Sequence, residues 1–488
     1  MPIDTARPDA HGRAFAASPT PLRILPRIGP GRARRANLVL RAGLSLAAVA
    51  SGLGGQAHAQ TSRDAIAIRQ PASDQADSPV AQDPQVSTPD FGLTGHWGGL
   101  RDDLHAAGID ISGSVWSEIA GNVSGGTRKD VTQVSGWAIN LDGDTEKLFG
   151  LEGGHFQVSF TKRQGPDINQ RAGLEMLLSP QEQYSRGQTY RLSELWYQQQ
   201  LGPITDIKLG RMGMGDDFGA LPCEFQNVNF CANQIGPLVG NYWYNNPLDP
   251  LAVRLRVKPG KFTFMAGVFQ SNPNDEKEDV ALYHKGANGV TVPIEAGWAS
   301  LVGGLPGSYR VGAWYNTARA DDLLDDANGQ PFAISGLDPD RKRGRYGAYL
   351  LARQQVTGTY KEGPPGPETT RGLTVFFNAM QADRRTSRTD SQIAAWLVYT
   401  APFAGRPHDS IGLAVSRENV NSRAALSETL ADPASTAPRA EYASELHYAF
   451  EVVPHFVLSP NVQYIVHPGG YPDRHDIVVL GLKTMLAL

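Results

Sequence analysis

The 488-residue sequence predicts an all-β fold: a transmembrane antiparallel β-barrel of about 16 strands. Three observations predict it. Apolar and polar residues alternate over runs of about ten residues, which is typical of strands that cross an outer membrane. The candidate strands are even in number, and the linkers between them tend to alternate between short and long. No apolar run reaches the roughly 18–20 residues of a spanning helix, which excludes an α-helical membrane protein.

Composition and charge narrow the class further. The 53 glycines and the aromatic residues (17 Phe, 16 Tyr and 8 Trp) suit a turn-rich β protein, and two cysteines are too few for a disulfide scaffold. Residues 1–59 hold eight of the 45 basic residues and two of the 49 acidic ones, so the rest of the chain has 37 basic and 47 acidic residues. Its net charge of about −10 argues against nucleic acid as a partner.

The N-terminal region has the pattern of an export signal. Three arginines within residues 32–35 precede a short apolar stretch at 42–53 and the sequence Ala-His-Ala at 57–59. This order predicts a signal peptide, residues 1–59, that is removed during export through the periplasm; a buried helix of a soluble domain is the alternative. Residues 60–90 are rich in Gln, Asp, Ser, Pro and Ala, so we expect a flexible polar leader there.

Sixteen candidate strands follow one another between residue 109 and the C-terminus. They span residues 109–124, 134–148, 154–164, 190–201, 205–216, 251–258, 261–271, 289–300, 307–319, 345–358, 371–383, 391–403, 409–420, 440–453, 456–467 and 476–488. The long linkers are residues 165–189, 217–250, 272–288, 320–344 and 421–439. Tight turns on one rim and long loops on the other are expected of an outer-membrane barrel, although the linker at 359–370 is longer than its side should allow. About sixteen strands leave a lumen wide enough for water.

Six segments, in order along roughly residues 91–488, carry a resemblance to a known family. They are LTGHWGGLRDDLHAAGI (93–109), RLSELWYQQQLG (191–202), PCEFQNVNFC (222–231), GVFQSNP (267–273), APFAGRPHDSIGLAVS (401–416) and SPNVQYIVHPGG (459–470). They resemble the carbohydrate-selective porins (porin B type) of Gram-negative outer membranes. The resemblance implies a barrel at residues 109–488 that passes sugars, glucose among them, by facilitated diffusion. It also implies an amphipathic helix at residues 91–108, with Trp97, Leu100 and Leu104 on one face. The chain departs from the family in ending on Leu488, where an aromatic residue commonly serves as a cue for insertion.

Strand phase turns one set of charged, amide and aromatic side chains toward the lumen. The set comprises Arg254, Arg256, Arg310, Glu118, Glu194, Glu445, Glu451, Trp116, Trp314, Asn461 and Gln463. Guanidinium and carboxylate groups bind sugar hydroxyls, and sugar C–H faces can lie on aromatic rings. Arg254 and Arg256 stand on successive inward positions roughly 7 Å apart, a spacing that a hexose could bridge. The alternative is that these charges hydrate the wall and pair with one another.

The linker at 217–250 contains both cysteines and is expected to fold into the lumen. It resembles the family loop that bears PCEFQNVNFC, and Cys223 and Cys231, exported together eight positions apart, are expected to form a disulfide. A zinc site would lack further sulfur and a neighbouring histidine. No cofactor or metal is expected. The other expected partners are outer-membrane lipid and the barrel-assembly machinery, and a monomer and a homotrimer both remain open.

Other kinds of chemistry have little support. GRMGMGDDFG (210–219) lacks the G-x-G-x-x-G order, and no G-x-S-x-G motif is present. Four aspartates at 321–326 lack the EF-hand spacing of a calcium site, so a solvated outer loop is expected there. Glu194, Glu445 and Glu451 are available for a glycosidase, but nothing sets them around a cleft. We therefore expect a channel and no enzyme; a general or small-acid porin, a secreted β-sandwich carbohydrate-binding protein and an adhesin remain as alternatives.

Overall fold

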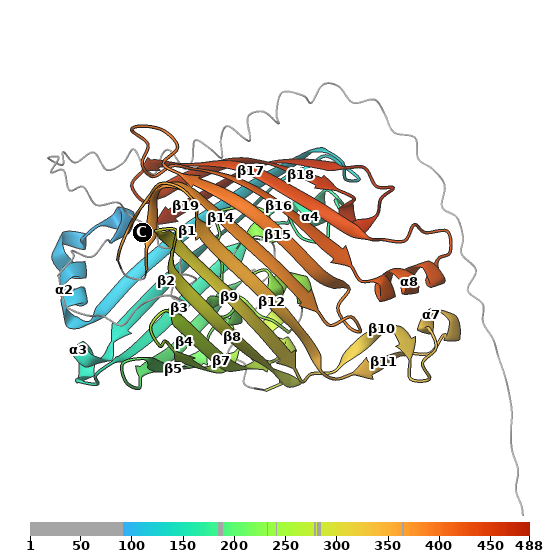
Figure 1. The fold of residues 1–488 in the computed structure, drawn as a ribbon, viewed down its shortest axis with the longest axis horizontal. Helices are drawn as coiled ribbons and strands as arrows, with labels where there is room; N and C mark the ends of the chain where they lie inside the picture. Colours follow the sequence, from blue (N-terminus) through green and yellow to red (C-terminus); the bar gives the residue numbers. More distant parts are fainter. Residues whose placement is uncertain are drawn as a thin grey trace, which may run out of the picture. The chain divides into compact units, whose positions relative to one another are not determined.

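The computed structural model describes residues 91–183, 189–231, 233–240, 242–277, 280, 285–363 and 366–488. These residues build one β-barrel (Figure 1). The predicted signal peptide and leader, residues 1–90, lie outside the described residues. Within the described part of the chain, no helix is long and apolar enough to cross a membrane.

The wall of the barrel is a ring of sixteen long antiparallel strands that pair in chain order, and the last strand pairs with the first. They are β1 (Ile109–Ser124), β2 (Val131–Asp144), β3 (Gly154–Gln164), β4 (Tyr190–Gln200), β5 (Thr205–Arg211), β6 (Leu251–Val257), β7 (Phe262–Ser271), β8 (Gly289–Val302), β9 (Leu305–Asn316), β12 (Arg345–Gln355), β14 (Glu368–Ala382), β15 (Thr389–Thr400), β16 (Ser410–Val420), β17 (Ala440–Val453), β18 (Phe456–Val466) and β19 (Ile477–Ala487). A three-residue strand, β13 (Thr359–Lys361), pairs with β14 and occupies the linker that was longer than expected. The predicted all-β class and the sixteen-strand barrel are confirmed.

Short helices lie in the connections and ahead of β1. They are η2 (Gly92–Thr94), η3 (Trp97–Gly99), α2 (Leu100–Ala107), α3 (Thr145–Phe149), α4 (Ile168–Arg171), α5 (Met214–Asp217), η4 (Val228–Phe230), α6 (Ile235–Val239), η5 (Pro273–Glu276), α7 (Phe332–Ser335), α8 (Ser422–Ala431) and η6 (Pro468–Gly470). A separate hairpin of β10 (Ala320–Asp326) and β11 (Pro339–Lys342) flanks α7.

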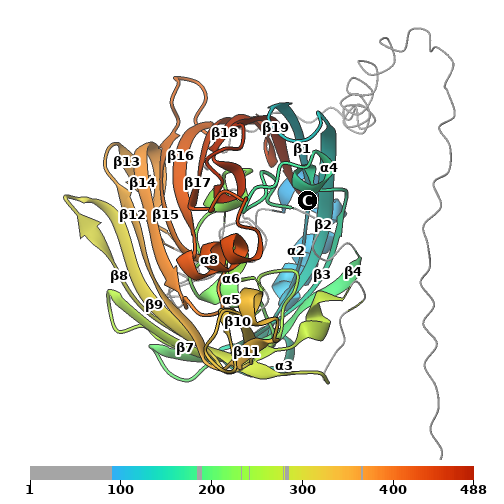
Figure 2. The same cartoon turned by 90° about the vertical axis from the view of Figure 1, so that its right-hand side faces the viewer.

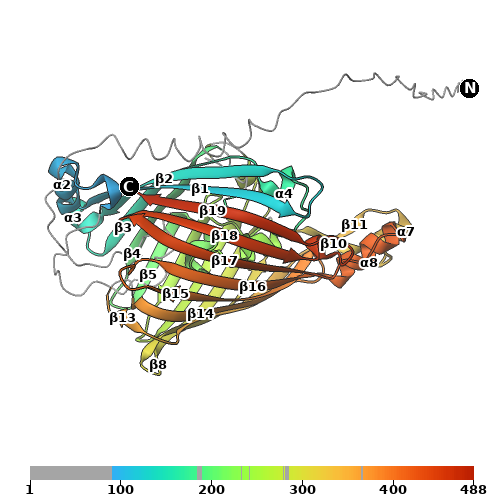
Figure 3. The same ribbon diagram turned by 90° about the horizontal axis from the view of Figure 1, so that it is seen from above.

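The connections distinguish the two ends of the barrel, which we call the turn rim and the loop rim (Figures 1 and 3). The turn rim carries α2, α3, the C-terminus and the mostly short connections that follow β4, β6, β8, β12, β15 and β17. The loop rim carries α7, α8 and the β10–β11 hairpin. In outer-membrane barrels the short turns face the periplasm and the long loops face outward.

The N-terminal helix is shorter than predicted. It covers Leu100–Ala107 only, and the residues before it form the two 3-10 turns η2 and η3. Gly95 and Gly98 have positive φ angles of 60° and 68°, a conformation that interrupts an α-helix and that glycine adopts without steric cost.

The end of β2 also differs from the prediction. The strand stops at Asp144 instead of running to residue 148. The Asp144 carboxylate accepts the N–H groups of Glu146 and Lys147, at 2.9 and 3.2 Å, and so caps α3. A capping side chain of this kind ends a strand but leaves the alternation of apolar and polar residues in the sequence unchanged. The alternation therefore predicted a strand that continues past its actual end.

The two faces of the wall have opposite character. On β6, Leu251, Val253 and Leu255 point outward and are 41%, 47% and 43% exposed, whereas Arg254 and Arg256 point inward and are buried. The large buried apolar side chains lie inside the ring, where wall residues pack against chain that folds into the lumen. An apolar outer surface and a polar inner wall are the arrangement that a lipid-embedded barrel requires.

Candidate functional site

The connection between β5 and β6, residues 212–250, folds into the barrel, and we call it the inserted loop. Figure 2, turned so that the loop rim faces the viewer, shows its helices α5 and α6 inside the ring of strands. Its side chains Phe218, Phe225, Phe230 and Trp243 are 0% exposed. The loop is therefore packed into the barrel as firmly as the core of a soluble domain.

One side of the inserted loop is attached to β5 and β6 by ion pairs. Asp217 at the end of α5 lies 3.2 Å from Arg254 Nε and 3.3 Å from Lys208 Nζ. Asp206 of β5 binds both Arg254 and Arg256; its Oδ2 is 2.8 Å from Arg256 Nε. All these side chains are at most 6% exposed. Arg254 and Arg256 thus lie on the inner wall, with their guanidinium groups engaged by carboxylates.

The opposite side of the loop is attached to β17, β18 and β19, mainly through backbone groups of the loop that bind side chains of the wall. The Glu445 carboxylate accepts the N–H of Gln226 at 2.9 Å and that of Asn227 at 2.7 Å. Lys483 donates to the carbonyl oxygens of Cys223 and Phe225 at 3.1 and 2.8 Å. A buried carboxylate and a buried ammonium group hold this part of the loop by its main chain.

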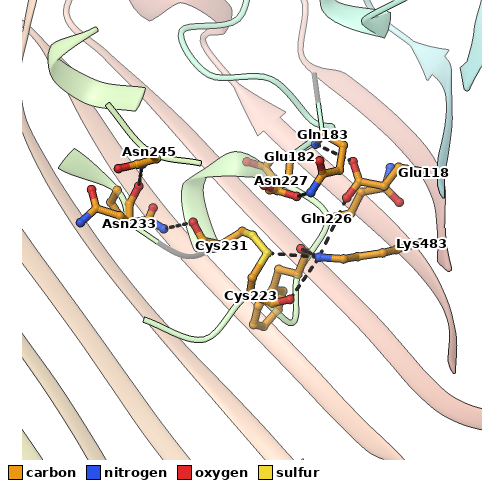
Figure 4. The surroundings of a disulfide bond; sticks show 12 residues. Glu118, Glu182, Gln183, Cys223, Gln226, Asn227, Cys231, Asn233, Asn245 and Lys483 are labelled. Carbon is orange, nitrogen blue, oxygen red and sulfur yellow. Dashed lines mark hydrogen bonds and ion pairs between the residues drawn. A yellow bond between two sulfur atoms is a disulfide. The ribbon is translucent and has the colours of Figure 1, made fainter. Parts of the chain in front are cut away.

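The disulfide lies within this second attachment (Figure 4). Cys223 and Cys231 are bonded to each other, and Lys483 lies 3.3 Å from Cys223 Sγ. Glu182 is the third possible metal ligand nearby, but both sulfurs are used by the disulfide, so the group does not fit a metal. Glu118 is buried beneath them, where it accepts the N–H of Gln183 at 3.0 Å and lies 3.9 Å from Lys483 Nζ.

The predicted amide residues belong to the same attachment. Asn461 Nδ2 donates to the Gln226 side chain at 2.8 Å. Gln463 accepts from Asn227 Nδ2 at 2.9 Å and donates to the carbonyl of Pro180 at 2.9 Å. Both β18 side chains therefore serve the packing of inserted chain against the wall.

A third attachment is made at β8, β9 and β12. Glu295 accepts the Tyr349 hydroxyl at 2.7 Å and the N–H of Gly219 at 2.8 Å. Arg310 lies 3.8 Å from Glu295 and donates to the carbonyl of Ala220, and its side chain is still 17% exposed. Arg310 is thus a predicted lumen residue that retains some access to solvent.

The remaining predicted residues have separate surroundings. Glu194 accepts hydrogen bonds from Gln157, Ser159 and Trp196 within the wall, at 2.6, 2.8 and 3.3 Å. Glu451 lies near the turn end of β17, where it accepts the N–H of His455 at 3.1 Å.

The two predicted tryptophans are inward and buried. Each ring lies over a glycine of the neighbouring strand, Trp116 over Gly136 and Trp314 over Gly347, where a Cβ would come within 2.8 and 2.1 Å of the ring. Trp314 Nε1 also donates to the Tyr242 hydroxyl of the inserted loop at 3.1 Å.

The inserted loop reaches across the lumen. Besides β5 and β6 on one side and β17 to β19 on the other, it contacts β15, where Gln392 donates to Asn229 at 3.1 Å. The attachments are thus distributed around the ring, and the inserted loop occupies part of the lumen (Figure 2). The residues that make them include Lys483, Glu295, Asp206 and Asp217, which sequence analysis did not single out. Lys483 is the only charged residue of its strand, a signal that was available.

The four aspartates at 321–326 have protein partners at the loop rim. The Asp322 carboxylate accepts hydrogen bonds from the N–H groups of Leu324 and Asp325, both at 3.0 Å. It also forms an ion pair with Arg423 of α8. Arg423 also lies 2.9 Å from Asp325. The carboxylates of Asp322 and Asp325 thus join the β10–β11 hairpin to α8.

Comparison with known proteins identifies the barrel. The model of the carbohydrate-selective porin family, OprB, matches residues 128–488. The chain belongs to this family. It is 34% identical over 414 residues to Porin B of Pseudomonas aeruginosa, covering 80% of this chain and 90% of that protein. It is 31% identical over 429 residues to the putative porin QuiX of Acinetobacter baylyi, covering 81% and 92%.

A solved structure agrees with this assignment. The structure of Pseudomonas putida OprB at high pH has 34% sequence identity and a TM-score of 0.77, covering 83% of this chain and all of that one. The chain is thus a carbohydrate porin of the Gram-negative outer membrane.

Proposed function

We propose that small sugars, glucose among them, cross the outer membrane by facilitated diffusion through the passage between the inserted loop and the wall. The observation that carries this proposal is the attachment of one loop to separate sectors of the ring, β5–β6, β8–β12 and β17–β19. An open barrel of sixteen strands would pass water and solutes with little discrimination. A loop fixed across it supports a narrow, polar passage of constant shape.

We infer that the predicted lumen residues contribute to this passage in two ways. Arg254 and Glu445 hold the loop directly through buried charged groups, and Arg256 supports them by binding Asp206, which also binds Arg254. Arg310 is the better candidate for direct contact with sugar, since its side chain is 17% exposed where that of Arg254 is 1% exposed. A guanidinium group offers two parallel donors, which suits neighbouring hydroxyls of a hexose.

Single-channel conductance in planar bilayers, with glucose added as a blocker, tests the proposal. Glucose should reduce the current of the wild type, and Arg310→Ala should weaken this block by roughly 10-fold or more, as loss of a hydrogen bond to a charged group implies. Arg353→Ala removes another inward-facing arginine and is the matched control, with a smaller expected effect. The double variant Arg254→Ala with Arg256→Ala should weaken the block and shift selectivity away from anions. A glucose-insensitive current would indicate a general porin, and block by small acids instead would indicate a small-acid porin.

We further propose that residues 1–59 are removed as a signal peptide, that residues 60–90 form a polar leader, and that the barrel-assembly machinery inserts the barrel as a monomer or homotrimer. The charge and apolar pattern of residues 32–59 supports the cleavage. N-terminal sequencing of the mature protein should begin after Ala59, and a start before Leu38 would contradict it. Native mass spectrometry in detergent distinguishes the two oligomeric states.

A further inference from the structure

The segment ahead of β1 presents apolar side chains outward. Leu93, Trp97 and Leu100 are 50%, 44% and 53% exposed, whereas Arg101, the basic residue among them, is only 3% exposed. An amphipathic helix that packed on the barrel through its apolar face would show the reverse. The apolar side of this segment is therefore directed to something other than the barrel wall.

Buried contacts fix this orientation. Arg101 donates to Thr94 Oγ1 at 3.0 Å, to the carbonyl of Gly95 at 3.1 Å and to the carbonyl of Leu488 at 3.3 Å. Its guanidinium group also lies 4.6 Å from the centre of the Trp97 ring. The segment is thus attached to the seam between β1 and β19 by the side that carries the charge.

The exposed apolar side chains continue along the turn rim. Phe149, at the end of α3, is 68% exposed, and Leu201 and Ile204 in the turn after β4 are 57% and 44% exposed. Lys147 of α3 donates to the carbonyl of His105 in α2 at 3.3 Å. The N–H of Gln200 donates to the carbonyl of Gly153 at 2.8 Å, which joins the next two connections. These contacts make one arc from α2 to the β4–β5 turn.

The arc follows directly on the ends of β2, β3 and β4, whose outer faces are apolar. Ile139 on β2, Phe160 on β3 and Leu195 on β4 point outward and are 50%, 47% and 51% exposed. Leucine, phenylalanine and tryptophan side chains at the edge of an apolar belt are typical of the membrane–water boundary. In a family whose short turns face the periplasm, that boundary is the phospholipid leaflet.

We propose that Leu93, Trp97, Leu100, Phe149, Leu201 and Ile204 form an interfacial membrane-binding surface that inserts into the phospholipid leaflet at the turn rim. Its ligand is the zone between headgroups and acyl chains. Apolar burial carries the contact, since Arg101 is buried and Asp102 pairs with His96 at 2.8 Å. The contact should therefore depend little on anionic lipid or salt.

Spin-label accessibility in reconstituted vesicles tests the proposal. Both native cysteines are in the disulfide, so Leu100→Cys and Phe149→Cys each provide one thiol for a nitroxide label. Leu397→Cys, on the outer face of β15, is the lipid reference, and Ile334→Cys, 67% exposed on α7 at the loop rim, is the water reference. Heat-modifiable gel mobility confirms that each variant has folded.

In vesicles of phosphatidylethanolamine and phosphatidylglycerol, the labels at 100 and 149 should be several-fold more accessible to oxygen than to a water-soluble nickel complex, as the label at 397 is. The same ratio should hold with phosphatidylcholine alone and in high salt. Accessibility to nickel like that at 334 would overturn the proposal, because the surface would then face water. Exclusion of both reagents would also overturn it, since another part of the chain or a second copy would then cover the surface.

Discussion

The inserted loop is attached by different chemistry on its two sides. At β5 and β6 the contacts are between side chains: the Asp217 carboxylate of the loop forms ion pairs with Arg254 and Lys208 of the wall. At β17 and β19, wall side chains bind the loop's backbone: Glu445 takes two N–H groups, and Lys483 binds two carbonyl oxygens. We call these the charge-side and the amide-side attachments.

The difference determines what each attachment requires of the loop sequence. The charge side needs an acid at one loop position, because without Asp217 the buried Arg254 would keep only Asp206 as its partner and Lys208 would lose its ion pair. The amide side depends mainly on the loop backbone, to which the Gln226 and Asn227 side chains add two hydrogen bonds with β18. Substitution of one loop side chain should therefore damage the first attachment more than the second, whereas substitution in the wall should damage both.

The largest effect is expected for Arg254→Ala. It removes the guanidinium group between Asp206 and Asp217 and leaves buried carboxylates with less compensation, at a cost of about 3–5 kcal/mol. Urea unfolding from vesicles measures this loss. Arg254→Lys keeps the charge and should recover part of it, and a stability within about 1 kcal/mol of the wild type for Arg254→Ala would contradict the charge-side attachment.

The disulfide comes next. Replacing both Cys223 and Cys231 with Ser should cost about 2–3 kcal/mol in the chain-entropy model, confined to the loop. Because the ring of strands is untouched, heat-modifiable mobility should persist while open-channel current noise rises and sugar selectivity loosens. Free thiols in freshly isolated native protein would argue against the bond.

Glu445→Gln should have a somewhat smaller effect on the amide side. An amide keeps one acceptor oxygen and turns a donor toward the second N–H, so one buried backbone donor loses its partner, at about 1–3 kcal/mol. Glu451→Gln on the same strand is the matched control, since Glu451 is half-buried and accepts one turn N–H. Equal losses of unfolding free energy in the two variants would show that the Glu445 carboxylate contributes no more stability than the single hydrogen bond of Glu451, and would contradict the amide-side attachment.

The smallest effect concerns a charge pair outside the lumen, between the β10–β11 hairpin and α8. Burial raises the pKa of Asp322, but the N–H groups of Asp325 and Leu324 and the Arg423 guanidinium outweigh it and hold that pKa below its ordinary value. A lowered folded-state pKa stabilises the contact at pH values above the unfolded value of about 3.9. This stabilisation is lost as the pH falls through the folded value.

A nitroxide at Leu426→Cys on α8 measures this contact. Its mobility should be constant from neutral pH down to about pH 4 and increase below it. With Arg423→Gln, the label should already be more mobile at neutral pH, and the acid-dependent step should shrink. A step of unchanged size in that variant would exclude the Asp322–Arg423 pair as its cause.

The wall could be predicted from sequence because its pattern is local. Alternation along β6 places Arg254 inward and Leu255 outward whatever fills the barrel. Strand ends were less predictable, as at β2, where a single capping carboxylate decides the boundary.

The partners of the inward residues could not be predicted in the same way. Arg254 meets Asp217 across 37 positions, and Glu445 meets the backbone of Gln226 across 219. The sequence of the inserted loop has no periodic pattern that would predict its path. Because every non-proline residue has a backbone N–H group, the sequence also does not indicate which of these groups Glu445 binds. For Lys483, too, the partners are loop carbonyl groups more than 250 positions away, which the pattern of its own strand does not indicate.

The pairing of β1 with β19 has a consequence for assembly. Thr484 donates to the carbonyl of Ser117, 367 positions away, so the last strand to be made closes on the first. Until then the sheet has two open edges, and open edges pair readily with other chains. Contacts between such distant residues also form slowly. A chain that stops before Ile477 would lack only eleven residues of wall, yet it would remain an open sheet, prone to aggregation and proteolysis instead of conduction.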